Sequence, residues 1–183
     1  MSPEWLDVWI GGLAAALLGL VVGSFLTVVA VRVPQRIQLQ SRSRCPRCQA
    51  LVRPRDNIPV VSWLVLHGKC RSCSEPISKL YPVIELATAT LFVLVVLGVR
   101  PVAAIPAYLY VAGISVVLTV IDAQTRRLPN GIVLPSYLVL PVLLALASWA
   151  TGDWGALLRA GAGGLGAYLL YGLLHLVPGG MGF

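Results

Sequence analysis

The sequence predicts an all-α polytopic membrane protein, with five transmembrane helices and one polar domain between the first two. Of the 183 residues, 57% are hydrophobic and only 11% are charged, which is far from the balance of soluble globular domains. Five apolar stretches approach the length of about 20 residues that crosses the hydrocarbon core. They lie near residues 8–31, 83–99, 102–121, 131–150 and 156–177.

The first stretch, residues 8–31, is predicted to be a transmembrane helix and not a cleaved signal peptide. Glu4 and Asp7 precede it where a signal peptide carries cations, and its apolar run is too long for one. Glycines recur along it, and small residues four apart let membrane helices approach closely. We therefore expect a packing surface at Gly12, Gly19 and Gly23.

The segment that follows, residues 32–80, is predicted to be cytoplasmic. Ten of the fourteen Lys and Arg lie between Arg32 and Lys79. By the positive-inside rule, the N-terminus is then outside and the C-terminal end is in the cytoplasm. This topology also explains the net charge of +7, so we expect no nucleic-acid partner. The basic residues of the loop are expected to lie against membrane lipid headgroups.

All four cysteines fall in this loop, as Cys45-Pro-Arg-Cys48 and Cys70-Arg-Ser-Cys73, separated by twenty-one residues. Two such turns can close a tetrahedral Cys₄ site, and a reducing cytoplasm disfavours disulfides. We predict a zinc-ribbon-like domain; a redox pair and unmetallated thiols are the alternatives. Four thiolates leave no position for a metal-bound water, so the zinc would be structural. His67 is not expected to be a ligand.

The remaining four stretches form the second membrane region, residues 81–183. Prolines inside spans are tolerated where neighbouring groups satisfy the freed backbone. The last stretch is rich in glycine and is expected to pack closely through Gly161, Gly163, Gly164 and Gly166. The domain division is therefore 1–31 for the first helix, 32–80 for the Cys₄ domain and 81–183 for the other four helices.

Asp122 is the first candidate for a catalytic residue. It ends an uncharged run at the mouth of a predicted membrane helix, where an ionisable carboxyl is a functional hypothesis by default. Peptide hydrolysis by carboxylates needs two acids, one acting as base and one as proton donor. The alternative for Asp122 is a salt bridge with Arg126. Glu85 lies at a similar depth, and we expect it to pair with a cation of the loop.

The sequence ends in a glycine-rich segment, Pro178-Gly-Gly-Met-Gly-Phe183. At a cytoplasmic membrane edge, glycine permits close approach of the backbone to a substrate. Gly180 and Gly182 are therefore weak candidates for substrate binding.

Several motifs resemble those of the type IV prepilin leader peptidases, a family of polytopic aspartic proteases. Asp122 followed by Arg127-Leu-Pro-Asn130 resembles the first catalytic motif, and Gly180-Met-Gly-Phe183 resembles the approach to the second, Gly-x-Gly-Asp. The resemblance implies that the second aspartate lies just beyond Phe183 and that this chain is truncated; the alternative is a relative without the second aspartate. The 183-residue chain by itself is expected to be inactive as a protease. Gly23–Pro34, with Thr27 where Asn is usual, resembles the N-terminal helix exit. Four further segments resemble the zinc domain: Cys45–Cys48, Asn57–Trp63, Gly68–Cys73 and Pro76–Glu85.

The resemblance also implies the reaction. Such enzymes remove the basic leader from prepilins of type IV pili and pseudopilins of type II secretion, at the cytoplasmic face of the bacterial inner membrane. Many members with the zinc domain also methylate the new N-terminus with S-adenosylmethionine, although no residue of this sequence places the methyl donor. The alternative is a non-enzymatic membrane assembly factor that docks a partner through its zinc ribbon.

Overall fold

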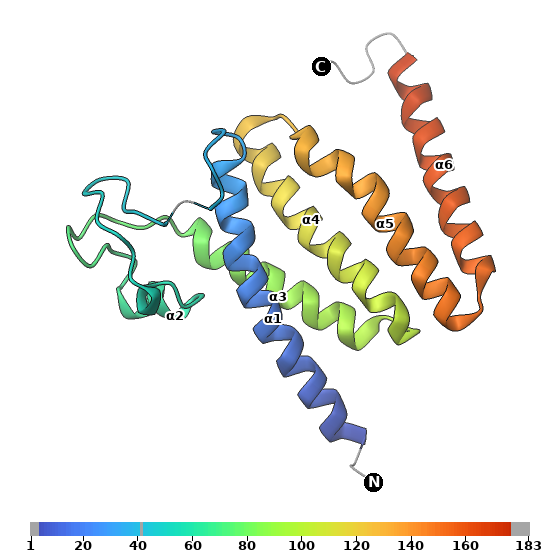
Figure 1. Cartoon of the computed structure of the whole chain (residues 1–183), viewed down its shortest axis with the longest axis horizontal. Coiled ribbons are helices and arrows are strands. Elements are labelled where there is room, and N and C mark those ends of the chain that lie inside the picture. The colour runs from blue at the N-terminus through green and yellow to red at the C-terminus, as the bar shows by residue number, and fades with distance from the viewer. Residues whose placement is uncertain (1–3, 41, 177–183) are drawn as a thin grey trace.

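A computed structural model describes residues 4–40 and 42–176 of the chain (Figure 1). Within these residues the chain is helical, and extended segments pair only at two isolated β-bridges. The helices, in chain order, are α1 (Glu4–Arg32), η1 (Pro54–Asp56), α2 (Val61–Val65), α3 (Leu80–Gly98), η2 (Val102–Ala104), α4 (Ile105–Thr125), α5 (Asn130–Thr151) and α6 (Trp154–Leu176).

The five long helices confirm the predicted spans, with ends that differ by a few residues. Each is long and apolar enough to cross a membrane, from Val8–Arg32 in α1 to Trp154–Leu176 in α6. Local chemistry sets several of the ends. Pro106 lies in the first turn of α4, where its missing N–H has no partner to lose. Gly152 ends α5 in the left-handed conformation that glycine adopts without strain.

The closest helix contact joins α1 to α3, which cross in Figure 1. A Cβ built on Gly19 would lie 2.5 Å from the Ala89 Cα, and one built on Gly23 would lie 2.8 Å from the Glu85 Cα. The hydroxyl of buried Thr27 donates to the Gly23 carbonyl, 2.9 Å away, so its polar group is satisfied within α1. The predicted packing role of Gly19 and Gly23 is confirmed.

The glycines of α6, unlike Gly19 and Gly23 of α1, do not lie against a neighbouring helix in the described part of the chain. A Cβ built on any of the four predicted packing glycines would meet no atom within 4 Å in the part of the chain that the structure describes. The expected close packing of Gly161, Gly163, Gly164 and Gly166 is therefore not found there. The reason is the position of α6, which contacts α5 at one side and has no buried residue.

The apolar core lies where α4 packs against α1 and α3. One buried cluster joins Val29 and Ala30 of α1 to Val117 and Ile121 of α4. A second cluster joins Ala15, Phe92 and Ala112, one residue from each of these helices. α5 is fixed to α4 by a hydrogen bond from the Tyr110 hydroxyl to the Ser136 hydroxyl oxygen, at 3.1 Å. The core holds the last turn of α4, which carries Asp122, beside the end of α1.

The α1–α3 crossing can be tested with single methyl groups. We expect Gly19→Ala to lower the free energy of unfolding by about 1–3 kcal/mol, because the new Cβ must displace backbone of α3. Gly12→Ala is the matched control, since its Cβ would lie 4.0 Å from a Leu97 side-chain atom. Thermal unfolding of both variants in detergent measures the difference. Equal stability of the two would contradict the close crossing.

Candidate active site and metal centre

The two C-x-x-C segments, Cys45–Gln49 and Cys70–Ser74, fold into turns of the same geometry, which we call the first and second knuckles. In each, the first cysteine carbonyl accepts from the backbone N–H four residues on, Gln49 to Cys45 at 3.0 Å and Ser74 to Cys70 at 2.9 Å. Gln49 and Ser74 both have a positive φ, 58° and 59°. An isolated β-bridge closes each turn, Arg44 with Leu51 and Lys69 with Pro76. This local repeat directs both pairs of sulfurs to one point.

The four cysteine sulfurs form one cluster. All lie within 4.8 Å of one another, and the Cys45 and Cys73 Sγ atoms are 3.7 Å apart. Four thiolates at about 2.3 Å from a tetrahedral zinc ion would be about 3.8 Å apart, whereas a disulfide needs about 2.05 Å. The cysteines are free, so the residues fit a closed four-thiolate metal site. Among the described residues, His67 is not part of this cluster.

The thiols of the cluster perturb one another. The pKa of Cys45 is lowered to about 7, mainly by the backbone N–H of Cys48 and then by that of Arg47. For Cys73, the backbone N–H of Glu75 lowers the pKa, but partial desolvation and the neighbouring sulfurs outweigh it and raise the pKa to about 12. The Cys73 thiol therefore stays protonated near neutral pH unless a cation compensates the negative charge of its thiolate.

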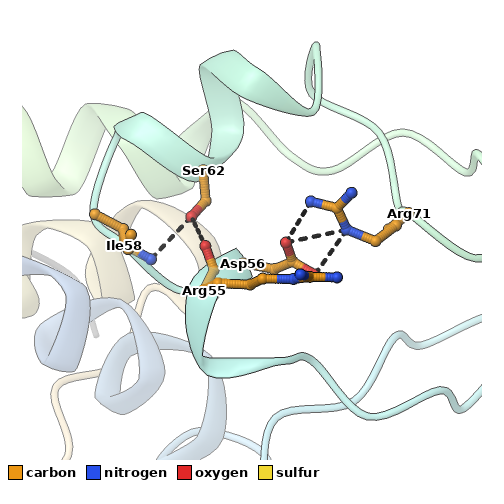
Figure 2. A network of polar contacts seen from close by, with 5 residues as sticks. All are labelled: Arg55, Asp56, Ile58, Ser62 and Arg71. Carbon is orange, nitrogen blue, oxygen red and sulfur yellow. Dashed lines mark hydrogen bonds and ion pairs between the residues drawn. The ribbon is translucent and has the colours of Figure 1, made fainter.

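An ion pair holds the second knuckle to the rest of residues 32–80, which we call the loop domain. The Arg71 guanidinium donates to both Asp56 carboxylate oxygens, with a shortest distance of 2.6 Å (Figure 2). Arg71 lowers the pKa of Asp56 through these hydrogen bonds. Beside it, the Ser62 hydroxyl donates to the Arg55 carbonyl at 3.1 Å and accepts from the Ile58 N–H at 2.9 Å. Sequence reasoning missed this network, because ten cations in the loop offered no way to choose a partner for Asp56.

Glu85 joins the loop domain to the membrane helices. Its carboxylate is only 6% exposed and accepts from the Val60 N–H at 2.7 Å. Val60 has φ 58° and ψ −49°, and the Val61 N–H donates across it to the Pro59 carbonyl. This is a rare, strained γ-turn, and a β-branched residue is unusual at a positive φ. The expected pairing of Glu85 with a cation is wrong, because a backbone N–H freed by this turn takes its place.

The hydrogen bond between the Val60 N–H and Glu85 predicts how variants at these two positions differ in stability. Glu85→Ala should lower the free energy of unfolding by about 1–3 kcal/mol, since it leaves the Val60 N–H without its partner. Glu85→Gln keeps an acceptor oxygen and should retain most of the stability. Val60→Gly in the Ala background should restore part of the loss, because glycine adopts a positive φ without strain. Hydrogen exchange over residues 58–66 measures this difference, and identical exchange in the Ala and Gln variants would contradict the prediction.

Asp122 lies in the last turn of α4, exposed, at the end of the bundle where α1 ends and α5 begins (Figure 1). Arg126 ends the helix at φ 51° and donates its backbone N–H to the Asp122 carbonyl at 2.7 Å. Among the described residues, no ion pair joins Asp122 to Arg126. The helix-end salt bridge is therefore absent, and the carboxylate is available to a substrate.

The structure groups the predicted site residues into two places. The four cysteines lie together in the loop domain, while Asp122 lies at the bundle end, and no hydrogen bond or ion pair between described residues joins the two. Gly180 and Gly182, the candidates for substrate binding, lie outside the described residues. A metal held by the cysteines and any chemistry at Asp122 would thus belong to separate parts of the chain.

Comparison with known proteins places these features in one family. A family model described as the bacterial peptidase A24 N-terminal domain matches residues 17–99. The prepilin leader peptidase/N-methyltransferase of Dickeya chrysanthemi is 35% identical over 196 residues, which cover 94% of this chain and 68% of the relative. That of Klebsiella pneumoniae is 35% identical over 170 residues, covering 89% and 74%. No solved structure matches. This chain belongs to the prepilin leader peptidase family.

Proposed function

We propose that this protein is a membrane aspartic endopeptidase that removes the leader from type IV prepilins and pseudopilins. The observation that carries the proposal is the 35% identity to a prepilin leader peptidase/N-methyltransferase over 94% of the chain. The exposed carboxylate of Asp122, at the end of a membrane helix and without an ion pair among the described residues, supports it. The names of the relatives also support N-methylation of the new N-terminus, with S-adenosylmethionine as methyl donor.

Asp122 is proposed as one of two acids that act on the scissile bond. One carboxylate removes a proton from the attacking water, while a protonated carboxyl donates to the carbonyl oxygen or the leaving amine. Two other acids are committed elsewhere and are poor candidates for the second role. Asp56 is held by Arg71, and Glu85 is buried against the Val60 N–H. The cleavage site of the substrate would therefore meet the bundle at the exposed end of α4.

Zinc is the proposed metal of the Cys₄ site. The sulfur separation of 3.7 Å suits tetrahedral thiolate coordination, and soft thiolates favour zinc over hard divalent cations. When bound, zinc would fix the two knuckles in place and leave no coordination position for water. Cys45, Cys48, Cys70 and Cys73 would hold it, and its role is structural.

The chain is a multi-pass membrane protein, and we propose the topology that its charges indicate. Residues 32–80 and the C-terminal end would lie in the cytoplasm, with the N-terminus outside. This orientation puts Asp122 at the cytoplasmic face, with basic residues of the loop domain near anionic lipid. The proposed domains are residues 1–31, 32–80 and 81–183; α1 ends at Arg32 and α3 begins at Leu80, close to these boundaries.

Expression of the protein from its own gene, together with a prepilin, in a bacterial strain without prepilin peptidase tests this function. We expect the prepilin to lose its leader, and mass spectrometry of the mature N-terminus would report methylation in the same sample. Prepilin that stays unprocessed, although the protein accumulates in the membrane, would contradict the proposal. That outcome would favour the non-enzymatic assembly factor.

A further inference from the structure

The short helix α2 turns a polar side chain inward and apolar side chains outward. Its buried Ser62 enters the hydrogen-bond network with Arg55 and Ile58 (Figure 2). On the other side, Val61, Leu64 and Val65 are 51%, 60% and 64% exposed. These positions, spaced three and four residues apart, share one face of a helix. We define the outer face of α2 as Val61, Leu64 and Val65.

The orientation of this outer face is fixed by specific contacts. Ser62 makes two hydrogen bonds on the inner side, and the Trp63 Nε1–H donates to the Ile77 carbonyl at 3.2 Å. The Trp63 ring also packs so closely on Gly68 that a Cβ there would lie 2.8 Å from the ring. The helix therefore cannot rotate its apolar side chains inward without losing these contacts. Exposed apolar side chains held in a fixed orientation on a polar loop domain make this face a candidate interaction surface.

The outer face is held beside the membrane region. Val60, the residue before α2, donates its N–H to Glu85 in the second turn of the membrane span α3. In Figure 1, α2 lies outside the bundle of long helices, near the end where α3 begins. On α3 itself, Val83 and Leu86 are exposed within the span. Apolar side chains at this level therefore lie next to a surface that already faces lipid.

The charge of the loop domain selects the kind of membrane surface. Ten cations lie between Arg32 and Lys79, against only two acids, Asp56 and Glu75. Both acids are already paired with arginines, Asp56 with Arg71 and Glu75 with Arg47. The remaining cations give the domain an excess of positive charge, which attracts anionic headgroups. An apolar face combined with basic surroundings is typical of segments that lie in a membrane interface.

We propose that the outer face of α2 inserts into the boundary between headgroups and acyl chains, with anionic phospholipid as its partner. The three apolar side chains enter the bilayer surface while the inner side keeps its polar network. The loop domain is then fixed to the membrane at two points, by α2 in the lipid and by Glu85 on α3. This inference goes beyond the proposed peptidase activity; only the leaflet that is contacted follows from the proposed topology.

A fluorescent amino acid placed at position 64 tests the contact. The full chain would be reconstituted in phosphatidylethanolamine–phosphatidylglycerol vesicles that contain a lipid spin-labelled near the top of its acyl chain. The same probe at Ser72, an exposed residue outside α2, is the matched control. We expect severalfold stronger quenching at position 64 than at 72. Unchanged metal content would show that both labelled proteins keep the Cys₄ domain folded.

Two outcomes would overturn the proposal. Equal quenching at positions 64 and 72 would mean that the face does not reach lipid. Quenching at 64 that appears only when the protein is diluted in lipid would assign the face to a second copy of the chain. A charged substitution gives an independent check, because Leu64→Asp should increase hydrogen exchange across residues 61–65 in vesicles, whereas Ser72→Asp should not. None of these measurements requires cleavage of a prepilin, so they fail or succeed independently of the proposed function.

Discussion

In the protein expressed from its own gene, replacing Asp122 by asparagine is expected to abolish prepilin cleavage. The amide matches the carboxylate in shape but cannot take a proton from water or hold one for donation. General acid–base groups contribute about 10²- to 10⁴-fold to a rate, and loss of one acid of a pair should fall at the upper end. Because the side chain is exposed and the Asp122 backbone carbonyl still accepts from Arg126, the fold should not change. Quantitative blotting of precursor and mature pilin over time measures the effect.

Asp153→Asn is the matched control for this variant. Asp153 precedes α6, where its Oδ1 accepts from the Ala156 N–H at 2.9 Å and its other oxygen pairs with Arg159. An asparagine keeps the first of these contacts and lies in a different loop. We expect cleavage at the rate of the unsubstituted protein, with equal amounts of both variants in the membrane. Cleavage that survives Asp122→Asn would remove Asp122 from the mechanism.

Loss of two thiolates is the second change with a large expected effect. The double variant Cys45→Ser, Cys48→Ser should fall from about one zinc per chain to none. Structural zinc contributes about 10–16 kcal/mol in small zinc-binding peptides, so the knuckles should unfold without it. Metal analysis by mass spectrometry and hydrogen exchange over residues 44–76 measure the two effects. The apolar core between α1, α3 and α4 contains none of these cysteines and should remain protected.

Ser72→Ala controls for substitution within a knuckle, because Ser72 lies between two cysteines and is not a ligand of the cluster. It should retain the metal and the native exchange pattern. Zinc that persists in the double cysteine variant would place the metal elsewhere in the chain. Folded knuckles without any metal would show that the thiols do not need a cation to hold their positions.

Patterns of composition and spacing were sufficient to predict much of this molecule. Five apolar stretches of membrane length could hardly adopt another structure, because a lipid environment requires every backbone group to be paired. The C-x-x-C spacing identified the four cysteines that converge, and glycine spacing identified the contact of Gly19 and Gly23 with α3. Glycine spacing failed on α6 because it indicates a capacity for close approach and does not identify a neighbour.

The polar contacts were the harder part. The spacing of Asp122 and Arg126 suits an ion pair on a continuing helix, but Arg126 adopts a left-handed conformation that ends the helix. Glu85 was expected to find a cation, since counting charges cannot reveal a backbone N–H that a turn at Val60 leaves free. Each outcome depends on the backbone conformation of a single residue, Arg126 in the first case and Val60 in the second. Such a conformation at a residue other than glycine has little signature in the sequence.

The length of α1 has a consequence for the way the protein sits in its bilayer. Its apolar span, Val8–Arg32, has 25 residues and is therefore about 37 Å long, whereas the hydrocarbon layer is about 30 Å thick. Hydrophobic mismatch of this size is relieved when the helix leans away from the membrane normal. A thicker bilayer should draw α1 upright and change its angle to α3. Lipid chain length is thus expected to act on the contact that Gly19 and Gly23 permit.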